Sequence, residues 1–256
     1  MQRYLVPKQG NPDACQQLFQ HPFQKQVLFD GTCFLFQSPL DQKWHKWPGI
    51  TGCIEKKFFF DYRAPTGHEL ASHKTSSTKD EGDRIHRQIH HVYTCIPREE
   101  CQCTKRVHLS RLSSRTKSAI KFIKDFDVEP NATEYTIISP ASHTGTRLDM
   151  IGKRFSGQSN QLSVIVSWKT GYAIDYDKNP LHQKMHGGLE EYESTPQHHN
   201  QLQSIIEYQM LKQDYGIQFD EYIIVYLDKD VKYRVEYLKD SALFRDKDGI
   251  FQYYCT

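Results

Sequence analysis

The chain has 256 residues, of which 38% are hydrophobic, 12% aromatic and 25% charged. This balance argues against a disordered chain, which would lack the apolar surface needed to offset its ordering entropy. The 33 Lys and Arg residues against 31 Asp and Glu leave a net charge of +2. Any affinity for polyanions must therefore come from local patches or a bound metal.

The sequence carries no sign of export or membrane insertion. No run approaches the ~18 apolar residues that a bilayer span requires, and residues 1–8 lack the apolar segment of a signal peptide. The seven cysteines are odd in number and unevenly spaced, which argues against a disulfide framework. We expect a soluble intracellular protein, in the cytoplasm or nucleus, with no membrane partner.

Residues 1–75 are rich in Gln and aromatic residues and are predicted to form an N-terminal extension. Within it, Val27–Phe36 has the pattern of two short strands around an Asp30-Gly31 turn. The aromatic residues interleaved with Lys at 43–47 could stack on bases, but such residues more often pack a small sheet. A polar stretch at 72–82 predicts a flexible connection, so we place a boundary near residue 75.

The remaining residues, 76–256, have the pattern of an α/β core. A basic amphipathic helix is predicted at 110–126, with its apolar residues at helical spacing. Three strands, a helix ended by Gly216 and a buried strand are predicted to follow, at 134–138, 147–151, 162–168, 200–215 and 222–227. This order predicts a central mixed β-sheet flanked by helices.

Two residues in neighbouring predicted strands have the types that phosphodiester hydrolysis requires. Asp149 lies within one strand, and Lys169 ends the next strand 20 positions later. Adjacent strands would bring the two side chains together. The carboxylate could then hold Mg²⁺, and the lysine could orient or deprotonate the attacking water.

From about residue 82 to residue 227, the chain resembles the RecB-like nucleases, an exonuclease branch of the PD-(D/E)XK superfamily. Gly82-Asp-Arg-Ile-His86 is similar to the family's Gly-x-x-x-His helix, whose His can ligate metal. Gly145-Thr-Arg-Leu-Asp149 resembles its Gly-x-x-Asp strand, and Glu134 matches the acid that precedes this strand.

Two further motifs follow in the family's order. Ser167-Trp-Lys-Thr-Gly171 resembles the family's Asp-Tyr-Lys-Thr-Gly, and Gln201 with Tyr208 resembles its Gln-x-x-x-Tyr helix. Each motif alone is weak, so the resemblance depends on their joint order. It implies a restriction-endonuclease-like core and a nuclease, using Mg²⁺ or Mn²⁺, that hydrolyses phosphodiester bonds in DNA.

The predicted site combines catalytic and metal-binding residues. The catalytic residues that the resemblance implies are Asp149, Lys169, Glu134, Gln201 and Tyr208. The candidate metal ligands are His86, Asp149, Ser167, the carbonyl of Trp168, and Glu207.

Two features of the chain depart from the family. Ser167 stands where the family has an acid, and the spacing from Gln201 to Tyr208 is longer than four. Either the site is impaired or a carboxylate arrives from elsewhere, with Glu207 the first choice and the acids at 190, 191 and 193 as others. The alternative is therefore a pseudonuclease that binds nucleic acid or protein, and a third possibility is an unrelated metal-free interaction domain.

Nucleic acid, with DNA preferred over RNA, is the predicted partner. The residues expected to contact it are Arg115, Lys117, Lys121 and Thr170. A solvated helix face would explain the three cations equally well.

A second cluster of potential ligands precedes the predicted catalytic strands. Cys95, Cys101, Cys103 and His108 could hold Zn²⁺, but their spacing is irregular for a structural zinc site. A reduced, mobile loop is the competing interpretation.

Overall fold

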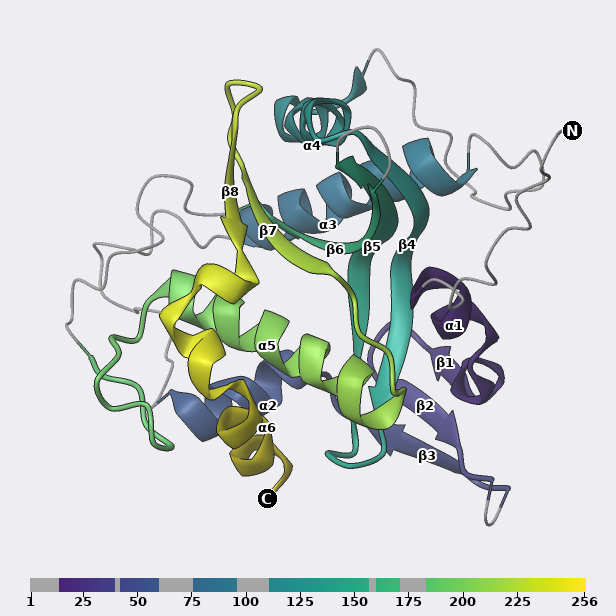
Figure 1. Ribbon diagram of the computed structural model, residues 1–256, viewed down its shortest axis with the longest axis vertical. Helices are drawn as coiled ribbons and strands as arrows, with labels where there is room; N and C mark the ends of the chain where they lie inside the picture. Colours follow the sequence, from purple (N-terminus) through teal and green to yellow (C-terminus); the bar gives the residue numbers. More distant parts are fainter. Residues whose placement is uncertain (1–13, 40–41, 60–75, 96–110, 157–159, 171–182) are drawn as a thin grey trace, which may run out of the picture.

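The computed structural model describes residues 14–39, 42–59, 76–95, 111–156, 160–170 and 183–256 (Figure 1). Its main sheet has the strand order β4-β5-β6-β7-β8. The strands are β4 (Val128–Ser139), β5 (Thr144–Ser156), β6 (Asn160–Lys169), β7 (Glu221–Leu227) and β8 (Tyr233–Tyr237). Strands β6 and β7 are parallel and the other neighbours are antiparallel. The predicted mixed sheet is confirmed.

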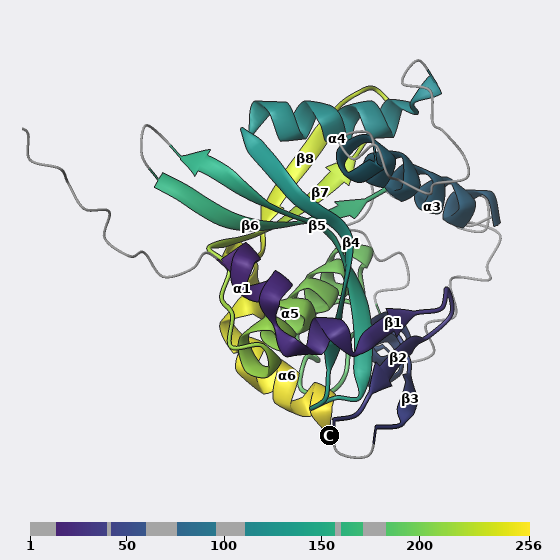
Figure 2. The same cartoon turned by 90° about the vertical axis from the view of Figure 1, so that its right-hand side faces the viewer.

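Helices cover both faces of this sheet (Figure 2). On one face lie α3 (Ser76–His90) and α4 (Ser114–Asp125), and on the other lie α5 (Pro196–Asp214) and α6 (Lys247–Cys255). Helix α2 (Ile50–Phe58) packs against α5. Within the described part of the chain, no helix combines the length and apolar character needed to cross a membrane.

Alternating side chains of the central strands fill two separate cores. Val166 and Trp168 of β6 are buried against α3 and α4, whereas Ile165 of the same strand is buried on the α5 face. Because successive strand residues point to opposite faces, Ser167 and Lys169 are directed toward α5. The β-branched runs that predicted these strands therefore also determine which helix each polar side chain meets.

Short helical segments complete the described chain. They are α1 (Ala14–Gln20), the 3₁₀ turns η1 (Pro22–Lys25), η4 (Leu238–Asp240) and η5 (Ala242–Asp246), and the π-helical turn η2 (His91–Cys95).

The N-terminal region forms a three-stranded antiparallel sheet of β1 (Val27–Phe29), β2 (Phe34–Gln37) and β3 (Trp44–Trp47). The predicted turn is confirmed, since Asp30 Oδ1 accepts hydrogen bonds of 2.8 Å from the N–H groups of Thr32 and Cys33. This small sheet lies against β5, where a Cβ on Gly145 would come within 2.3 Å of Phe34 Cγ. Only glycine permits this approach.

The N-terminal region also contributes to the main core. Leu18, Ile54 and Phe58 are fully buried in the same hydrophobic cluster as Ile206 of α5. The boundary predicted near residue 75 lies outside the described residues. The extension that the sequence predicts is thus packed on the α5 side of the sheet.

Candidate metal centre

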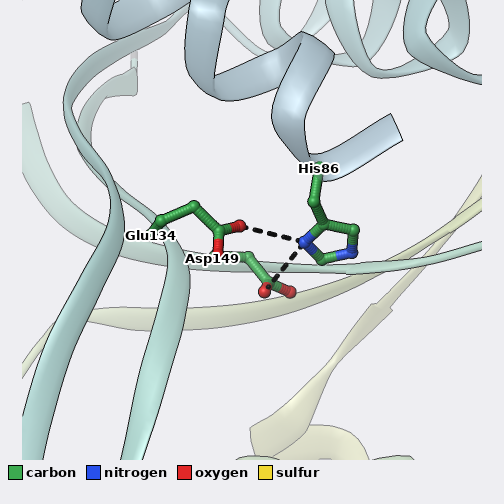
Figure 3. A group of neighbouring side chains, drawn as sticks. All are labelled: His86, Glu134 and Asp149. Carbon is green, nitrogen blue, oxygen red and sulfur yellow. Dashed lines mark hydrogen bonds and ion pairs between the residues drawn. The ribbon is translucent and has the colours of Figure 1, made fainter. Parts of the chain in front are cut away.

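Three side chains from three different elements converge beside the sheet. Figure 3 shows His86 of α3 pointing at the carboxylates of Glu134 in β4 and Asp149 in β5. His86 Nδ1 lies 3.0 Å from Glu134 Oε1 and 3.3 Å from Asp149 Oδ1. The three side chains are 14–25% exposed, so the group is enclosed but open to solvent.

The strand register brings the two acids together. Glu134 and Asp149 lie between the paired residues Thr133↔Met150 and Tyr135↔Leu148, so they occupy facing positions. Glu134 has a φ of 54°, in the left-handed region that costs a non-glycine residue about 1–2 kcal/mol. Such strain in the middle of a strand is typical of a functional position.

Charges within and beside this group shift the pKa values of His86 and Asp149. Burial lowers the pKa of His86, but the carboxylates of Asp149 and Glu134 outweigh burial and raise this pKa to about 10. Burial likewise raises the pKa of Asp149, but the charges of His86 and Lys169 prevail and hold this pKa below its usual range. The site therefore keeps Asp149 as a carboxylate.

Two neighbours on β6 fix the orientation of Asp149. The Ser167 hydroxyl donates a 3.1 Å hydrogen bond to Asp149 Oδ2, and the Trp168 N–H donates one of 2.7 Å to the same oxygen. Asp149 Oδ1 is thereby turned toward His86. Ser167 lies outside the convergent group of three and contacts it through Asp149, whereas ligation by the Trp168 carbonyl stays a prediction.

Lys169 lies between the candidate metal centre and α5. Its ammonium donates a 3.1 Å hydrogen bond to Gln203 Oε1, and Gln203 Nε2 donates a 3.0 Å hydrogen bond to Glu207 Oε1. The charge of Lys169 also lowers the pKa of Asp149, so the predicted proximity of Asp149 and Lys169 agrees with the structure. The α5 contact holds the lysine on the Asp149 side of the sheet.

Glu207, the expected replacement for the missing acid, does not join the three donors. Its side chain is buried, and its oxygens accept hydrogen bonds from Thr146 at 2.9 Å, from Gln203 and from Tyr222. Burial raises the pKa of Glu207 even though the charge of Lys169 opposes this shift. In this arrangement Glu134, and not Glu207, supplies the second carboxylate of the group.

The predicted Gln201 and Tyr208 pair also points elsewhere. Gln201 donates a hydrogen bond to Glu236, and the Tyr208 ring lies 5.2 Å from the Phe244 ring. The residues of α5 that reach the site are Gln203 and Glu207, four positions apart on one helix face. Seven positions end about 20° short of two full helical turns, so Gln201 and Tyr208 do share a face of α5, but this face is roughly opposite to that of Gln203 and Glu207. The prediction was wrong because the structure turns the Gln201 face toward Glu236 and Phe244.

A spacing in the Asp149 strand also differs from the family motif. Asp149 follows Gly145 by four positions, so Thr146 stands where Gly-x-x-Asp requires glycine. Gly145 meets Phe34, and Thr146 binds Glu207. The position of Asp149 is consistent with the expected site although the glycine is displaced.

The predicted nucleic-acid contacts lie on or near α3 and α4. Arg115 forms a 2.9 Å ion pair with Glu81, and Lys121 pairs with Asp125. Lys117 is exposed. Thr170 Oγ1 lies beside Gly82, 3.1 Å from where a Cβ would stand. Their role in nucleic-acid binding stays a prediction.

The proposed zinc ligands cannot be located in the described chain. Cys101, Cys103 and His108 lie outside the described residues, as does the side chain of Cys95.

Two contacts of the site were not expected from the sequence. Arg147 forms a 3.1 Å ion pair with Glu134, and the Tyr222 hydroxyl donates to Glu207. Arg147 precedes Asp149 by two positions in a strand, and this spacing could have indicated a shared face. Tyr222 begins an apolar run, so its sequence context gave no comparable signal.

The two carboxylates of this group suit a hard divalent cation, whereas His86, whose pKa is raised to about 10, would have to lose its proton to become a ligand. Neighbouring ligands of an octahedral ion with bonds of 2.0–2.1 Å lie about 3.0 Å apart, close to the 3.0 and 3.3 Å separations at His86 Nδ1. All three ligand atoms lie within 4.8 Å of one another. Carboxylates are ligands that Mg²⁺ and Mn²⁺ prefer, and an octahedral ion held by so few protein atoms would keep positions for water and substrate.

No family model matches this chain, and no curated protein matches its sequence. The resemblance to the RecB-like nucleases therefore depends on the residues and contacts described above.

Proposed function

We propose that the protein is a RecB-like, metal-dependent nuclease that hydrolyses phosphodiester bonds in DNA. The observation that carries this proposal is the convergence of His86, Glu134 and Asp149 beside Lys169. The strained backbone of Glu134 supports it, because strain of this kind accumulates where geometry serves function. Fold alone would not suffice, since one fold can carry many activities.

Each residue has a distinct role in the proposed reaction. His86, Glu134 and Asp149 would hold Mg²⁺ or Mn²⁺, which when bound supplies charge stabilisation and an activated water. Ser167 and Trp168 keep Asp149 in one orientation through its Oδ2 atom. Lys169, held by Gln203, orients the attacking water and stabilises the negative charge that develops on the phosphate.

A second candidate function follows from Ser167. Its neutral hydroxyl stands at the family's acid position and donates to Asp149, which leaves the site one carboxylate short of the family's pattern. A catalytically impaired protein would retain the fold as a nucleic-acid or protein-binding module. We favour the nuclease because Glu134 supplies a second carboxylate at the same centre.

The cellular location we propose is the cytoplasm or nucleus. Among the described residues, Cys15, Cys33, Cys53 and Cys255 form no disulfide bond, which fits a reducing compartment.

The decisive experiment measures cleavage of labelled linear DNA and RNA, single- and double-stranded, with Mg²⁺, Mn²⁺ or EDTA. We expect cleavage that requires metal and falls by at least about 100-fold in Asp149→Asn and Lys169→Ala. Lys239→Ala, which removes an exposed lysine of η4, is the control and should retain activity. The affinity of the protein for Mn²⁺ should fall in Asp149→Asn, which changes a proposed metal ligand, and should stay close to that of the wild type in Lys169→Ala, which does not.

The same experiment separates the two candidate functions. Absence of cleavage by folded wild-type protein with every substrate and metal would refute the nuclease. Retained DNA binding in that case would support the impaired module. Activity unchanged by Asp149→Asn would place the reaction outside this centre.

A further inference from the structure

Arg147 lies beside the candidate metal centre and has two independent contacts. Its Nη1 is 3.1 Å from Glu134 Oε2, and its Cζ lies 4.6 Å from the centre of the Phe29 ring. Arg147 and Asp149 are two positions apart on β5, so their side chains leave the same face of the strand. Arg147 is thereby a direct neighbour of the residue that anchors the site.

These contacts hold the guanidinium group without enclosing it. The side chain is 43% exposed, although an ion pair and an aromatic ring fix its position. A guanidinium has five N–H donors, and the ion pair with Glu134 engages Nη1. Phe29 is itself braced by Phe34, whose ring centre is 4.8 Å away. Arg147 is therefore preorganised and accessible at once.

Balancing the charge of Glu134 does not by itself account for this arrangement. Glu134 Oε1 already contacts His86 Nδ1 at 3.0 Å, while Arg147 contacts the other oxygen, Oε2. The arginine thus lies on the outer side of the carboxylate, away from the three convergent ligand atoms. From there it can hold Glu134 and still present N–H donors to a second anion.

We propose that Arg147 binds a backbone phosphate of the nucleic-acid strand next to the phosphate being cleaved. This inference rests on the proposed function and names the residue that holds its substrate. A planar guanidinium matches two non-bridging phosphate oxygens, which a lysine ammonium cannot do in the same way. A fixed cation also offsets the repulsion between the two carboxylates and an incoming polyanion.

The test measures the affinity of the full chain for a fluorescent single-stranded DNA oligonucleotide by anisotropy. Ca²⁺ replaces Mg²⁺, because oxygen-rich sites accept it. Arg147→Ala should weaken binding about tenfold, and the slope of log affinity against log salt should become shallower by about 0.7. Arg147→Lys should lie between wild type and Arg147→Ala. Arg245→Ala removes the same charge from the exposed surface of η5 and should change neither quantity.

A second readout distinguishes substrate binding from support of Glu134. Mn²⁺ affinity without DNA should change less than threefold in Arg147→Ala if the arginine serves the phosphate. Equal DNA affinity and salt slope in Arg147→Ala and wild type would overturn the inference, as would a loss confined to Mn²⁺ affinity. Cleavage is measured separately from binding. If DNA binding depended on Arg147 but the wild-type protein cleaved no DNA, the proposed nuclease activity would be refuted and the phosphate-binding role of Arg147 would stand.

Discussion

Ser167 is the residue whose chemistry differs most from that of the family the chain resembles. It is 2% exposed, and its hydroxyl lies 3.1 Å from Asp149 Oδ2. A carboxylate at this position would add a metal ligand, but it would also place two negative charges within hydrogen-bonding distance. At an effective dielectric constant of 20, such a pair repels by about 4 kcal/mol.

Replacement of Ser167 by aspartate should therefore have opposite effects without and with metal. In EDTA, Ser167→Asp should be less stable than the isosteric, neutral Ser167→Asn, by roughly 2 kcal/mol after solvent relaxation. With Mn²⁺ in excess, the order should reverse, because the metal binds the folded state and an added carboxylate raises its affinity. Thermal unfolding of both variants with and without Mn²⁺ measures this. Equal Mn²⁺-induced shifts in the two variants would show that residue 167 does not face the metal.

The sequence predicted which residues meet at the centre of the candidate site better than it predicted their neighbours. Asp149 and Lys169 could be identified because adjacent strands bring their positions together. Glu134 was identified through the family motif, but its left-handed backbone follows from no local pattern. The contact of Arg147 with Phe29 joins residues 118 positions apart, and no rule of spacing predicts a contact between two separate sheets.

At the scale of elements, the strands and helix α5 were predictable, but the rotation of α5 was not. An amphipathic helix indicates its inward face by its apolar stripe. Polar residues on α5 are buried as well, among them Gln201, Ser204, Glu207 and Gln209. Since burial extends around much of the helix, hydrophobic spacing could not distinguish Gln203 from Gln201 as the residue that meets Lys169.

Two matched glutamine variants test which face of α5 serves the site. Gln203→Ala removes the acceptor of the Lys169 ammonium and one donor to Glu207, so the cleavage rate should fall by about tenfold. Gln201→Ala removes a hydrogen bond to Glu236 and should leave the rate within about twofold, with a stability loss of about 1 kcal/mol. Initial rates at saturating DNA and metal measure the difference. A larger rate loss in Gln201→Ala than in Gln203→Ala would indicate that Gln201, the residue of the family's motif, acts at the site.

At the scale of the whole molecule, the N-terminal region and the main sheet bury apolar surface in common. Ile54 of α2 is fully buried in the cluster that includes Ile206 of α5 and Ile224 of β7. Trp168 lies on the other side of the sheet, in the core formed with α3 and α4. Elements that share a core tend to unfold together, because the loss of one element exposes the apolar side chains of the elements packed against it.

This coupling predicts that a destabilising substitution in α2 also lowers the stability of the core on the opposite face of the sheet. Ile54→Ala should lower the free energy of unfolding by about 2–5 kcal/mol, as expected for a buried aliphatic residue. The loss should be visible in the fluorescence of Trp168, in a background carrying Trp44→Phe and Trp47→Phe. Leu28→Ala, which truncates a side chain 55% exposed on β1, is the control and should cost less than about 0.5 kcal/mol. If Trp168 reported the same transition with and without Ile54→Ala, residues 14–59 would constitute an independent folding unit, and the candidate metal centre would not depend on them.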